Sequence, residues 1–547
     1  MHIDSRPILA VLALAACKGG GADPDSHTIT NTVTNTVTNT VTNTAVQPGP
    51  GRWESPLTQL AQVFDDRGAT GTHGVLEDHM HVDEVRYRDS DQRLFYCSYT
   101  FGVIDVSDPA DPEYMAQGYE WDLGSPVGRK TGCLHVDWDD ADPDIVYVSH
   151  RGNYDFQPHL SVVDLQADPK TGDLDPVQAT PLRETDVSYE GLDAENGLVY
   201  VALHQGGIGV FQRDPATNEM SRVGGEATLV PNAYDIEVVG TLAYVVDEDD
   251  GLYVLDVTDP NAITQVSHLY IGGIDRDLQV DGDYAYIAAG GAGLVIVDIS
   301  DPANPAIVSF TDTHGTAIRV GYDGDRVAVA AWNDTRVYDV SDRTAPDFIG
   351  AARIERSKDY VGDDANERPD ITARTLGVDL HGDDLFIGNW MTPYTYKIHA
   401  DRVAPYIVLP EDIFYMGVGS VEVGTTGTYD IDVANQGTAP LTILDSWVSN
   451  PAFEVSPAQA VVQPGDEVTL TITYTATVET EETGIFNLLT DDPAQPLRKG
   501  YVVGNPEGIG IGDQFPYTEG TEVLSLNSWT SDAFAGQVTL LAYFATF

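Results

Sequence analysis

Short apolar runs alternate with acidic, glycine-rich turns over residues 56 to 402. The clearest unit runs from Gly282 to Pro302. It holds two apolar runs separated by a glycine turn, and it ends on Asp-Pro. Apolar runs this short, bounded by Gly, Asp and Pro, predict β-strands rather than helices. We therefore expect the region to be all-β.

The unit occurs seven times. The same position of its second apolar run is occupied by Asp105, Asp164, Gln212, Asp256, Asp298, Asp339 and Lys397. These anchors lie 41 to 59 residues apart, close to the period of β-propeller blades. One unit cannot bury both faces of its sheet, so the copies must pack around a common axis. We predict a seven-bladed β-propeller over residues 53–404, with residues 56–64 pairing at the edge of the seventh blade to close the ring.

The run Leu294-Val295-Ile296-Val297-Asp298 resembles the motif of LVIVD-repeat proteins, which are bacterial and archaeal surface propellers. The resemblance covers residues 56 to 402. It implies the propeller fold and a cell-surface or periplasmic setting. It implies no single activity, because propellers carry many functions.

The start of the chain predicts export. Residues 8–16 form a short apolar core, and Leu14-Ala15-Ala16-Cys17 resembles a bacterial lipobox. The resemblance implies that residues 1–17 end in a lipidated Cys17, and Lys18 after it implies an outer-membrane lipoprotein on the periplasmic or cell-surface side. The alternative is a secretory signal with a chance cysteine. The Thr/Asn-rich residues 18–52 are predicted to form a disordered tether between the membrane and the propeller.

The chain has 86 Asp and Glu against 28 Lys and Arg, a net charge of −58. This charge argues against a nucleic-acid partner. The acids serve either solubility in salt or calcium binding through oxygen ligands. The densest acidic strings, Asp137–Asp144 and Asp247–Gly251, do not have the spacing of a known calcium loop, so we favour solvated turns.

Two cysteines remain if Cys17 carries lipid. Cys97 and Cys133 form an even pair in an oxidising compartment, which suits a disulfide. Two separate buried thiols explain the sequence equally well, because sequence alone does not give the distance between them.

The two faces of the propeller differ in their loops. The Asp-Pro turns lie on one face, where Asp caps the turn and Pro fixes φ, so we interpret them as structural. The long insertions 124–132, 151–158 and 352–375 fall on the other face. Insertions gathered on one face commonly mark a binding surface. We expect an unknown protein or small-molecule ligand to contact Arg129, Tyr154, His159 and Arg356.

The same face opens onto the axial channel. Aligning the first strand of each copy places these residues at equivalent positions: His81, His135, Gly191, Asp235, Asp277, Arg319 and Gly377. His79, His81 and His135 could hold a transition metal, and Asp235, Asp277 and Arg319 belong to the same candidate surface. The alternative is that polar side chains line a wet channel. The chain lacks a recognisable catalytic motif, so we assign no catalytic residue.

Residues 413–505 alternate as short strands and predict an antiparallel β-sandwich. The phrases Val433–Leu441 and Val462–Val468 resemble Ig-like repeats of bacterial surface proteins related to the ASPM/SPD-2/hydin group. The resemblance implies a spacer or adhesion role without an active site.

Residues 506–547 resemble an incomplete thioredoxin/TlpA-like domain, through Ile511–Pro516 and Phe534–Phe547. The likeness stops where that family has its first redox residue, so we expect a truncation or a selenocysteine codon after Phe547. The leading hypothesis is a lipid-anchored binding module with an Ig-like spacer. The alternative is a redox enzyme that uses this segment or a channel metal.

Overall fold

The computed structural model describes residues 53–63, 82–98, 101–117, 132–138, 142–151, 158–166, 174, 177–178, 182–184, 187–354, 374–389, 392–410 and 416–506, together with the backbone of 11–14, 519–521, 528–530 and 538–541. Every regular element among these residues is a β-strand, as the sequence predicted. No described helix has the length and apolarity needed to cross a bilayer.

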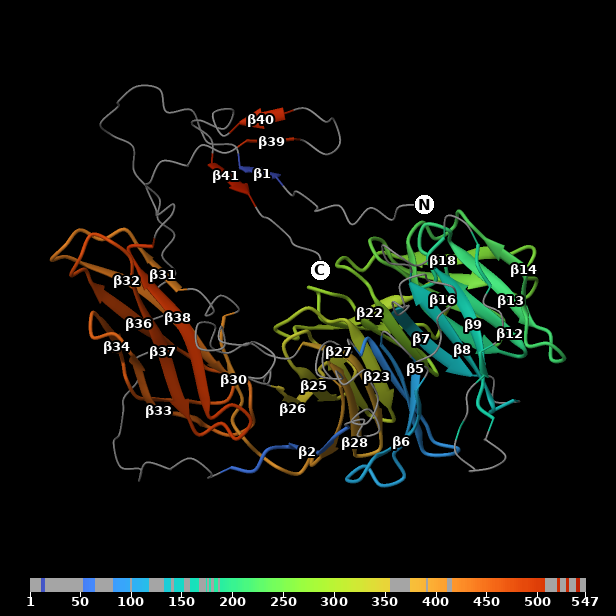
Figure 1. The fold of residues 1–547 in the computed structure, drawn as a ribbon, viewed down its shortest axis with the longest axis horizontal. Helices are drawn as coiled ribbons and strands as arrows, with labels where there is room; N and C mark the ends of the chain where they lie inside the picture. The colour runs from blue at the N-terminus through green and yellow to red at the C-terminus, as the bar shows by residue number, and fades with distance from the viewer. Residues whose placement is uncertain are drawn as a thin grey trace, which may run out of the picture.

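Seven antiparallel four-stranded sheets form a propeller (Figure 1). From the inner strand outward, blade 1 is β3 (Glu84–Arg88), β4 (Arg93–Cys97), β5 (Phe101–Asp105) and β6 (Glu113–Gln117). Blade 2 is β7 (Gly132–Trp138), β8 (Ile145–Arg151), β9 (His159–Asp164) and β10 (Val177–Gln178). Blade 3 is β11 (Leu192–Glu195), β12 (Leu198–Ala202), β13 (Ile208–Arg213) and β14 (Met220–Glu226). Blade 4 is β15 (Ala233–Val239), β16 (Leu242–Asp247), β17 (Gly251–Asp256) and β18 (Thr264–Leu269). Blade 5 is β19 (Asp277–Asp281), β20 (Tyr284–Ala288), β21 (Leu294–Asp298) and β22 (Ala306–Thr311). Blade 6 is β23 (Arg319–Asp323), β24 (Arg326–Ala330), β25 (Thr335–Asp339) and β26 (Asp347–Ala352). Blade 7 is β27 (Thr375–His381), β28 (Asp384–Asn389), β29 (Pro393–Ile398) and β2 (Leu57–Gln62).

The ring closes through the N-terminal strand, as the sequence predicted. Strand β2 pairs antiparallel with β29, with Leu57 opposite Ile398 and Gln62 opposite Tyr394. This pairing covers an edge that would otherwise expose unpaired backbone groups. Apolar side chains of neighbouring blades then pack face to face, as Val246 and Leu252 of blade 4 do with Ile287 of blade 5.

The Asp-Pro turns are structural, as expected. In blade 5, Asp298 Oδ1 accepts a hydrogen bond from Ser300 N at 2.9 Å, and Asp301 Oδ1 accepts one from Ala303 N at 3.2 Å. The same pairs of bonds recur in blades 1, 4 and 6. Bonds from Ser300 hold the pKa of Asp298 below its usual value.

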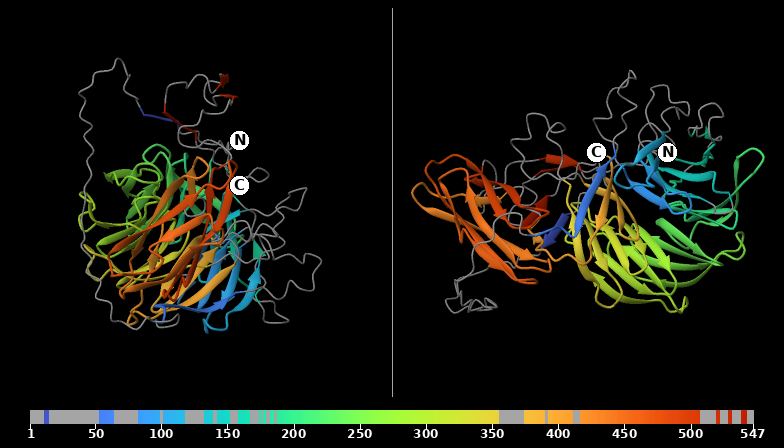
Figure 2. Two further views of the ribbon diagram at one scale, coloured as in Figure 1. Left: turned by 90° about the vertical axis from the view of Figure 1, so that its left-hand side faces the viewer. Right: turned by 90° about the horizontal axis from the view of Figure 1, so that it is seen from below.

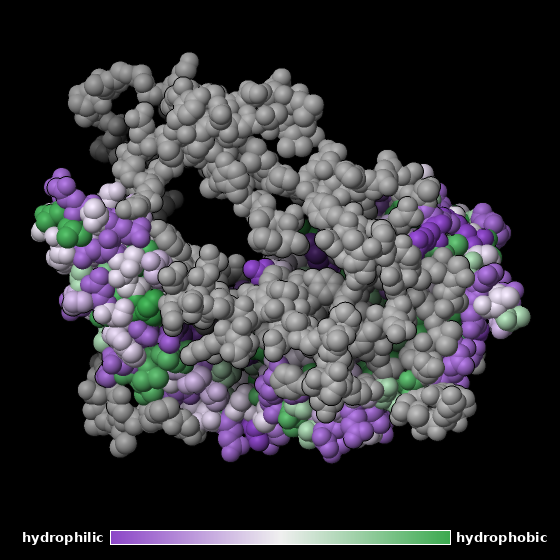
Figure 3. Space-filling view, viewed as in Figure 1, coloured by the Kyte–Doolittle hydropathy of each residue, from purple (hydrophilic) through white to green (hydrophobic). Residues whose placement is uncertain are grey.

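In Figure 3, hydrophilic side chains predominate on the described propeller surface.

A disulfide joins Cys97 to Cys133, with their Cα atoms 4.9 Å apart. Cys97 ends β4 of blade 1 and Cys133 lies in β7 of blade 2. The bridge therefore links two neighbouring blades near the start of the ring, and it decides between the two alternatives that the sequence left open.

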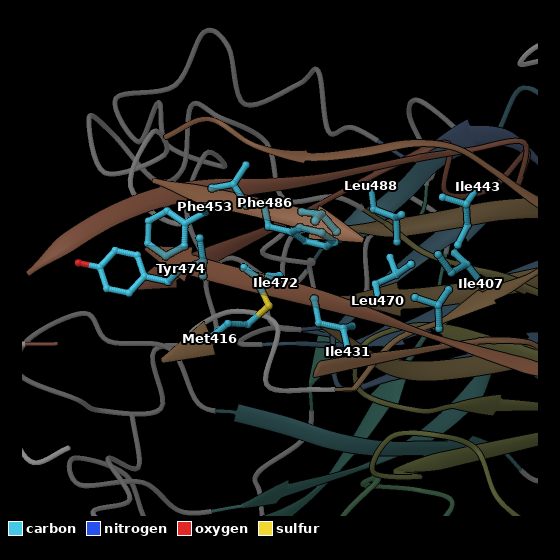
Figure 4. Packing of buried hydrophobic residues seen from close by; sticks show 14 of the residues in the cluster. Ile407, Met416, Ile431, Ile443, Phe453, Leu470, Ile472, Tyr474, Phe486 and Leu488 are labelled. Atoms are coloured by element: carbon cyan, nitrogen blue, oxygen red, sulfur yellow. The ribbon is translucent and has the colours of Figure 1, made fainter. Parts of the chain in front are cut away.

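The second domain is a sandwich of two sheets. Their strand orders are β30-β32-β36-β34 and β31-β38-β37-β33-β35. The strands are β30 (Ile407–Val408), β31 (Met416–Gly419), β32 (Thr426–Asn435), β33 (Leu441–Val448), β34 (Phe453–Ser456), β35 (Ala460–Val462), β36 (Glu467–Thr475), β37 (Glu482–Thr490) and β38 (Leu497–Gly504). Alternate residues face inward, and Figure 4 shows Ile431, Leu470 and Phe486 meeting in the core.

The sandwich rests on blade 6 of the propeller (Figures 1 and 2). Tyr406, just before β30, donates its hydroxyl hydrogen to Asp334 Oδ2 at 2.6 Å. Arg336 binds Asp334 through two nitrogens at 3.1 Å and donates to Gln436 Oε1 at 2.6 Å. Arg336, Asp334 and Tyr406 are all buried, so the junction is a packed polar contact.

Short strand pairs also occur outside the two domains. Strand β1 (Val11–Leu14) pairs with β41 (Val538–Leu541), and β39 (Glu519–Thr521) pairs with β40 (Ser528–Thr530). The expectations about Cys17, the tether and the redox position after Phe547 fall outside the described residues, as does most of the predicted thioredoxin-like segment.

Candidate functional site: the axial channel

The inner strands of the blades bring seven equivalent residues around the axis. The ring consists of Glu84, His135, Gly191, Asp235, Asp277, Arg319 and Gly377, each of them buried or a glycine. The prediction of His81 at the blade 1 position was wrong, because β3 continues to Arg88 before its turn. Glu84 therefore pairs with Cys97 as Asp277 pairs with Ala288.

Carboxylates around the axis bind the backbone of the next blade. Each of the seven junctions has at least one bond from a backbone N–H to a carboxylate of the preceding blade. These pairs are Asp379–Tyr87 (2.7 Å), Glu84–Val136 (2.6 Å), Asp137–Ala194 (2.7 Å), Asp193–Val238 (2.9 Å), Asp235–Leu278 (3.0 Å), Asp277–Val320 (2.7 Å) and Asp323–Gly382 (2.5 Å).

Six of these bonds have donors within inner strands, and they explain why those strands are acidic; the seventh, to Gly382 N, lies in an exposed turn. The inner strand is the free edge of its sheet, so N–H groups on that edge lack a strand partner. A buried N–H without an acceptor costs free energy, and a carboxylate of the preceding blade supplies the acceptor. Part of the chain's acidity therefore holds the blades together. Gly191 leaves room for one of these acids, because a Cβ there would lie 1.9 Å from Asp235 Oδ1.

Arg319 crosses the channel and contacts three other blades. Its Nη1 lies 2.9 Å from Asp277 Oδ1 and also contacts His135 Nε2. Its other nitrogens donate to Asp83 O at 3.3 Å and Leu134 O at 3.2 Å. A planar guanidinium with five donors suits this spread of acceptors. Arg319 thus ties blade 6 to blades 1, 2 and 5.

His135 lies between acids and Arg319. Its Nδ1 is 3.2 Å from Glu84 Oε1 and 3.9 Å from Asp235 Oδ1. Burial and Arg319 each lower the pKa of His135, but Glu84 and Asp235 outweigh them and raise it. A proton on Nε2 would point at Arg319, so the contact as it stands requires Nε2 to accept and Nδ1 to donate to Glu84.

A second layer of channel residues lies two positions further along the inner strands and contains more acids than the ring. Arg86 Nη1 lies 3.2 Å from Asp137 Oδ1 and is the cation of this layer. Burial raises the pKa of Glu237 to about 8 and that of Asp379 to about 6, and it holds the pKa of Asp193 well above its usual value. In the ring above, burial also raises the pKa of Asp277 to about 7.

The channel has a shape and donor set suited to a small ion. Its cavity of about 70 Å³ is lined by both layers, and it is far smaller than pockets for drug-sized ligands. Ligand atoms of His135, Asp235 and Asp277 lie within 4.8 Å of one another. Arg319 already contacts His135 and Asp277, however, so a metal at these three residues would have to displace its guanidinium.

The outer mouth of the channel carries a stack of two arginines on a tyrosine. Arg151 donates to Glu190 Oε2 at 2.6 Å and to the Tyr234 hydroxyl at 2.9 Å. The guanidinium carbons of Arg151 and Arg276 lie 5.3 Å and 5.6 Å from the centre of the Tyr234 ring. The two arginine side chains are 43% and 31% exposed, so this stack reaches solvent.

The other predicted residues have mixed outcomes. His135, Asp235, Asp277 and Arg319 meet in the channel, as the alignment predicted. His159 is instead fully buried on β9, and its ring stacks on His150 with centroids 4.0 Å apart. The remaining candidates lie outside the described residues: His79, His81, Arg129, Tyr154 and Arg356.

Glu84, Arg86, Glu237 and the Arg151–Tyr234–Arg276 stack were not predicted from the sequence. A signal for Glu237 existed, because acids at alternate positions of one strand, Asp235 and Glu237, face the same side. The stack had no local signal, because its members come from three blades.

Two family models match the chain. The LVIVD repeat matches residues 232–268 and 272–313, within blades 4 and 5, and the "Abnormal spindle-like microcephaly-assoc'd, ASPM-SPD-2-Hydin" domain matches residues 417–496. These matches support the two resemblances seen in the sequence, a β-propeller and an Ig-like domain. None of the curated proteins matches the chain.

Two solved structures are similar to parts of the chain. The computationally designed Ika8 protein is 10% identical, with a TM-score of 0.39, over 62% of this chain and 100% of its own. The β-propeller domain of Cps50 (Swd1) from Myceliophteria thermophila is 11% identical, with a TM-score of 0.43, over 58% of this chain and 96% of its own. The strand pairings establish the propeller without them.

Proposed function

We propose that the chain is an exported, lipid-anchored interaction module. In this proposal Cys17 carries the lipid, residues 18–52 form the tether, and the channel-mouth face of the propeller contacts a partner outside the inner membrane. The Ig-like domain acts as a spacer that the junction at Tyr406 holds against blade 6.

The observation that carries the proposal is the contrast between the two faces. On the Asp-Pro face, the repeated aspartates bind the backbone of their own turns, so a structural role accounts for them without a ligand. At the mouth, Arg151 and Arg276 flank Tyr234 and remain partly exposed in a strongly acidic chain. Arg and Tyr are among the residues enriched at binding hot spots.

The redox alternative is not better supported. A channel metal would compete with Arg319 for His135 and Asp277, and the predicted thioredoxin-like segment lies mostly outside the described residues. The disulfide between Cys97 and Cys133 is consistent with export, because disulfides persist mainly in oxidising compartments.

Cell fractionation of wild type and Cys17→Ser tests the anchor. The wild type should remain with membranes, whereas the variant should be soluble. Equal membrane retention of both proteins would refute lipid anchoring at Cys17.

Site-specific photo-crosslinking in intact cells tests the contact face. A crosslinking residue replaces exposed Asp249 on the mouth face or exposed Asp283 on the Asp-Pro face. We expect an adduct from position 249 that weakens when Arg151 and Arg276 are changed to Ala, and none from position 283. Adducts from position 283 alone would place the contact on the wrong face.

A further inference from the structure

Four consecutive blade junctions share one local arrangement near the channel mouth. A backbone N–H at the start of each inner strand, or two residues before it, donates to a carbonyl in the turn that follows the second strand of the preceding blade. These bonds are Ala233 N to His204 O (3.2 Å), Asp275 N to Glu248 O (3.2 Å), Ala317 N to Gly290 O (3.0 Å) and Thr375 N to Trp332 O (2.9 Å). At the first of these junctions His204 N also donates to Ala233 O at 2.9 Å.

The shared backbone bond identifies equivalent pairs of buried side chains. Each pair joins the N–H donor to the residue immediately before the carbonyl acceptor. From the 3/4 junction to the 6/7 junction the pairs are Leu203 with Ala233, Asp247 with Asp275, Ala289 with Ala317, and Ala331 with Thr375. All eight residues are at most 1% exposed.

The 4/5 junction therefore has two carboxylates where the other three junctions have apolar residues or one threonine. The propeller architecture does not require acids at this place, because Ala289 and Ala317 build the same contact one junction later. Two buried carboxylates side by side are costly unless something compensates their charge. The compensation must be specific to this junction.

Asp275 receives no compensation from the described residues. Its side chain is 0% exposed, and neither carboxylate oxygen has a hydrogen-bond partner among them. Asp247 is better placed, since its oxygens accept from Asn232 N at 2.7 Å and Asp249 N at 3.0 Å. Burial, together with the charge of Asp247, raises the pKa of Asp275 to about 7.

Neighbouring cations are engaged elsewhere. Glu248 takes the charges of His204 at 3.3 Å and Arg276 at 3.6 Å. The carboxylate pair is thus a concentration of hard oxygen donors without a counterion among the described residues.

We propose that Asp247 and Asp275 bind a hard divalent cation, calcium, at the junction of blades 4 and 5. The two carboxylates supply the charged ligands, and backbone carbonyls and water complete an oxygen shell. Asp247, the first residue of the acidic string Asp247–Gly251, is then a cation ligand rather than part of the solvated turn expected from the sequence, because it is only 1% exposed. The bound ion would join two blades beside the channel mouth.

Calorimetric titration and thermal unfolding of the chelator-treated full chain test this site. Wild type should bind one Ca²⁺ per chain, with a Kd of about 10⁻⁴–10⁻³ M, as in extracellular calcium modules. Saturating Ca²⁺ should raise the propeller's unfolding temperature by about 2–4 °C, because the ion binds only the folded state. Mg²⁺ should have a smaller effect, because it gives up its water reluctantly.

Asp275→Ala is the decisive variant, because it installs the residue found at Ala317 in the next junction and should fold. It should lose the Ca²⁺ response, and Asp247→Ala should lose it as well. Asp283→Ala, which removes an exposed acid on the opposite face, should respond like wild type. An equal response of wild type and Asp275→Ala would overturn the proposal. It would also fall if wild type ignored Ca²⁺ at about 10 mM, ten times the weakest expected Kd, since Asp275 would then be neutralised by a proton.

Discussion

Arg319 in the propeller channel and Arg336 at the domain junction are both buried, and each is bound to an aspartate. Their surroundings differ. At the junction, Asp334 meets one guanidinium and one Tyr406 hydroxyl, so charges and hydrogen bonds balance. In the channel, Arg319 binds Asp277 while Glu84 and Asp235 lie close by on the other side of His135.

The two regions therefore differ in how their buried charges are balanced. At the junction, Arg336, Asp334 and Tyr406 satisfy one another, and their contacts hold the two domains together. The channel contains more carboxylates than permanent cations, and each acid also has to accept a backbone N–H of the next blade. Protons must supply part of the missing positive charge, as the raised pKa values of Asp277 and Glu237 indicate.

Removing the channel cation should have the largest effect. Arg319→Met leaves Asp277 and its acidic neighbours without their guanidinium, so we expect the propeller to lose about 3–5 kcal/mol in unfolding free energy. Urea denaturation measures the loss. The control is Arg326→Met, whose pair with Asp383 lies at the surface and should cost at most about 1 kcal/mol. Equal losses of unfolding free energy for the two variants would mean that Arg319 does not stabilise the propeller by linking its blades.

The space beside the channel acids is tested next. In Gly191→Ala the new methyl group would lie 1.9 Å from Asp235 Oδ1, so Asp235 must move away from Leu278 N. We expect a loss of about 1–3 kcal/mol. Gly291→Ala is a suitable control, because a Cβ there meets nothing within 4 Å. If Gly191→Ala were as stable as this control, the acid–amide bond would not depend on that glycine.

The junction should respond more weakly and only locally. Tyr406→Phe removes one hydrogen bond to Asp334 but keeps the ring against Phe348, with centroids 5.2 Å apart. We expect a loss of about 1 kcal/mol, seen as faster proteolysis between the domains while the propeller's own unfolding is unchanged. Tyr270→Phe, at a 63% exposed position, should change neither property. A shift in propeller unfolding for Tyr406→Phe would mean that the two regions are coupled.

The sequence predicted the architecture because the repeat carries it locally. Asp298 and Asp301 cap their own turns, and each apolar run is a strand by itself, so seven copies sufficed to predict seven blades and the closing strand. The sandwich was predicted to begin at residue 413, but β30 (Ile407–Val408) already belongs to its first sheet, because a two-residue strand leaves no recognisable pattern in the sequence.

The site was harder to predict because its contacts are not local. Arg319 in blade 6 and His135 in blade 2 are 184 residues apart in sequence, and an error in one strand's length put His81 where Glu84 lies. Tyr406 lies between the domains in sequence, and nothing near it indicates that its partner is Asp334. Acids at alternate positions of inner strands, such as Asp235 and Glu237, were the usable signal.

Replacing Glu237 should change how stability depends on pH rather than remove a contact. Burial raises the pKa of Glu237 to about 8, although the bond from Val280 N at 2.8 Å and the charge of Arg86 oppose this. Between the unfolded value near pH 4.5 and about pH 8, the folded state holds a proton that the unfolded state has released. The stability that this group contributes is therefore fully present below pH 4.5 and is lost as the pH rises through 8. Glu237→Gln keeps the acceptor for Val280 N but does not titrate, so its unfolding midpoint should fall less than that of wild type between pH 5 and pH 8, the window set by the Glu237 pKa. Parallel pH profiles for wild type and variant would show that Glu237 is already ionised in the folded channel, and that Arg86 balances more of the acidic layer than the geometry suggests.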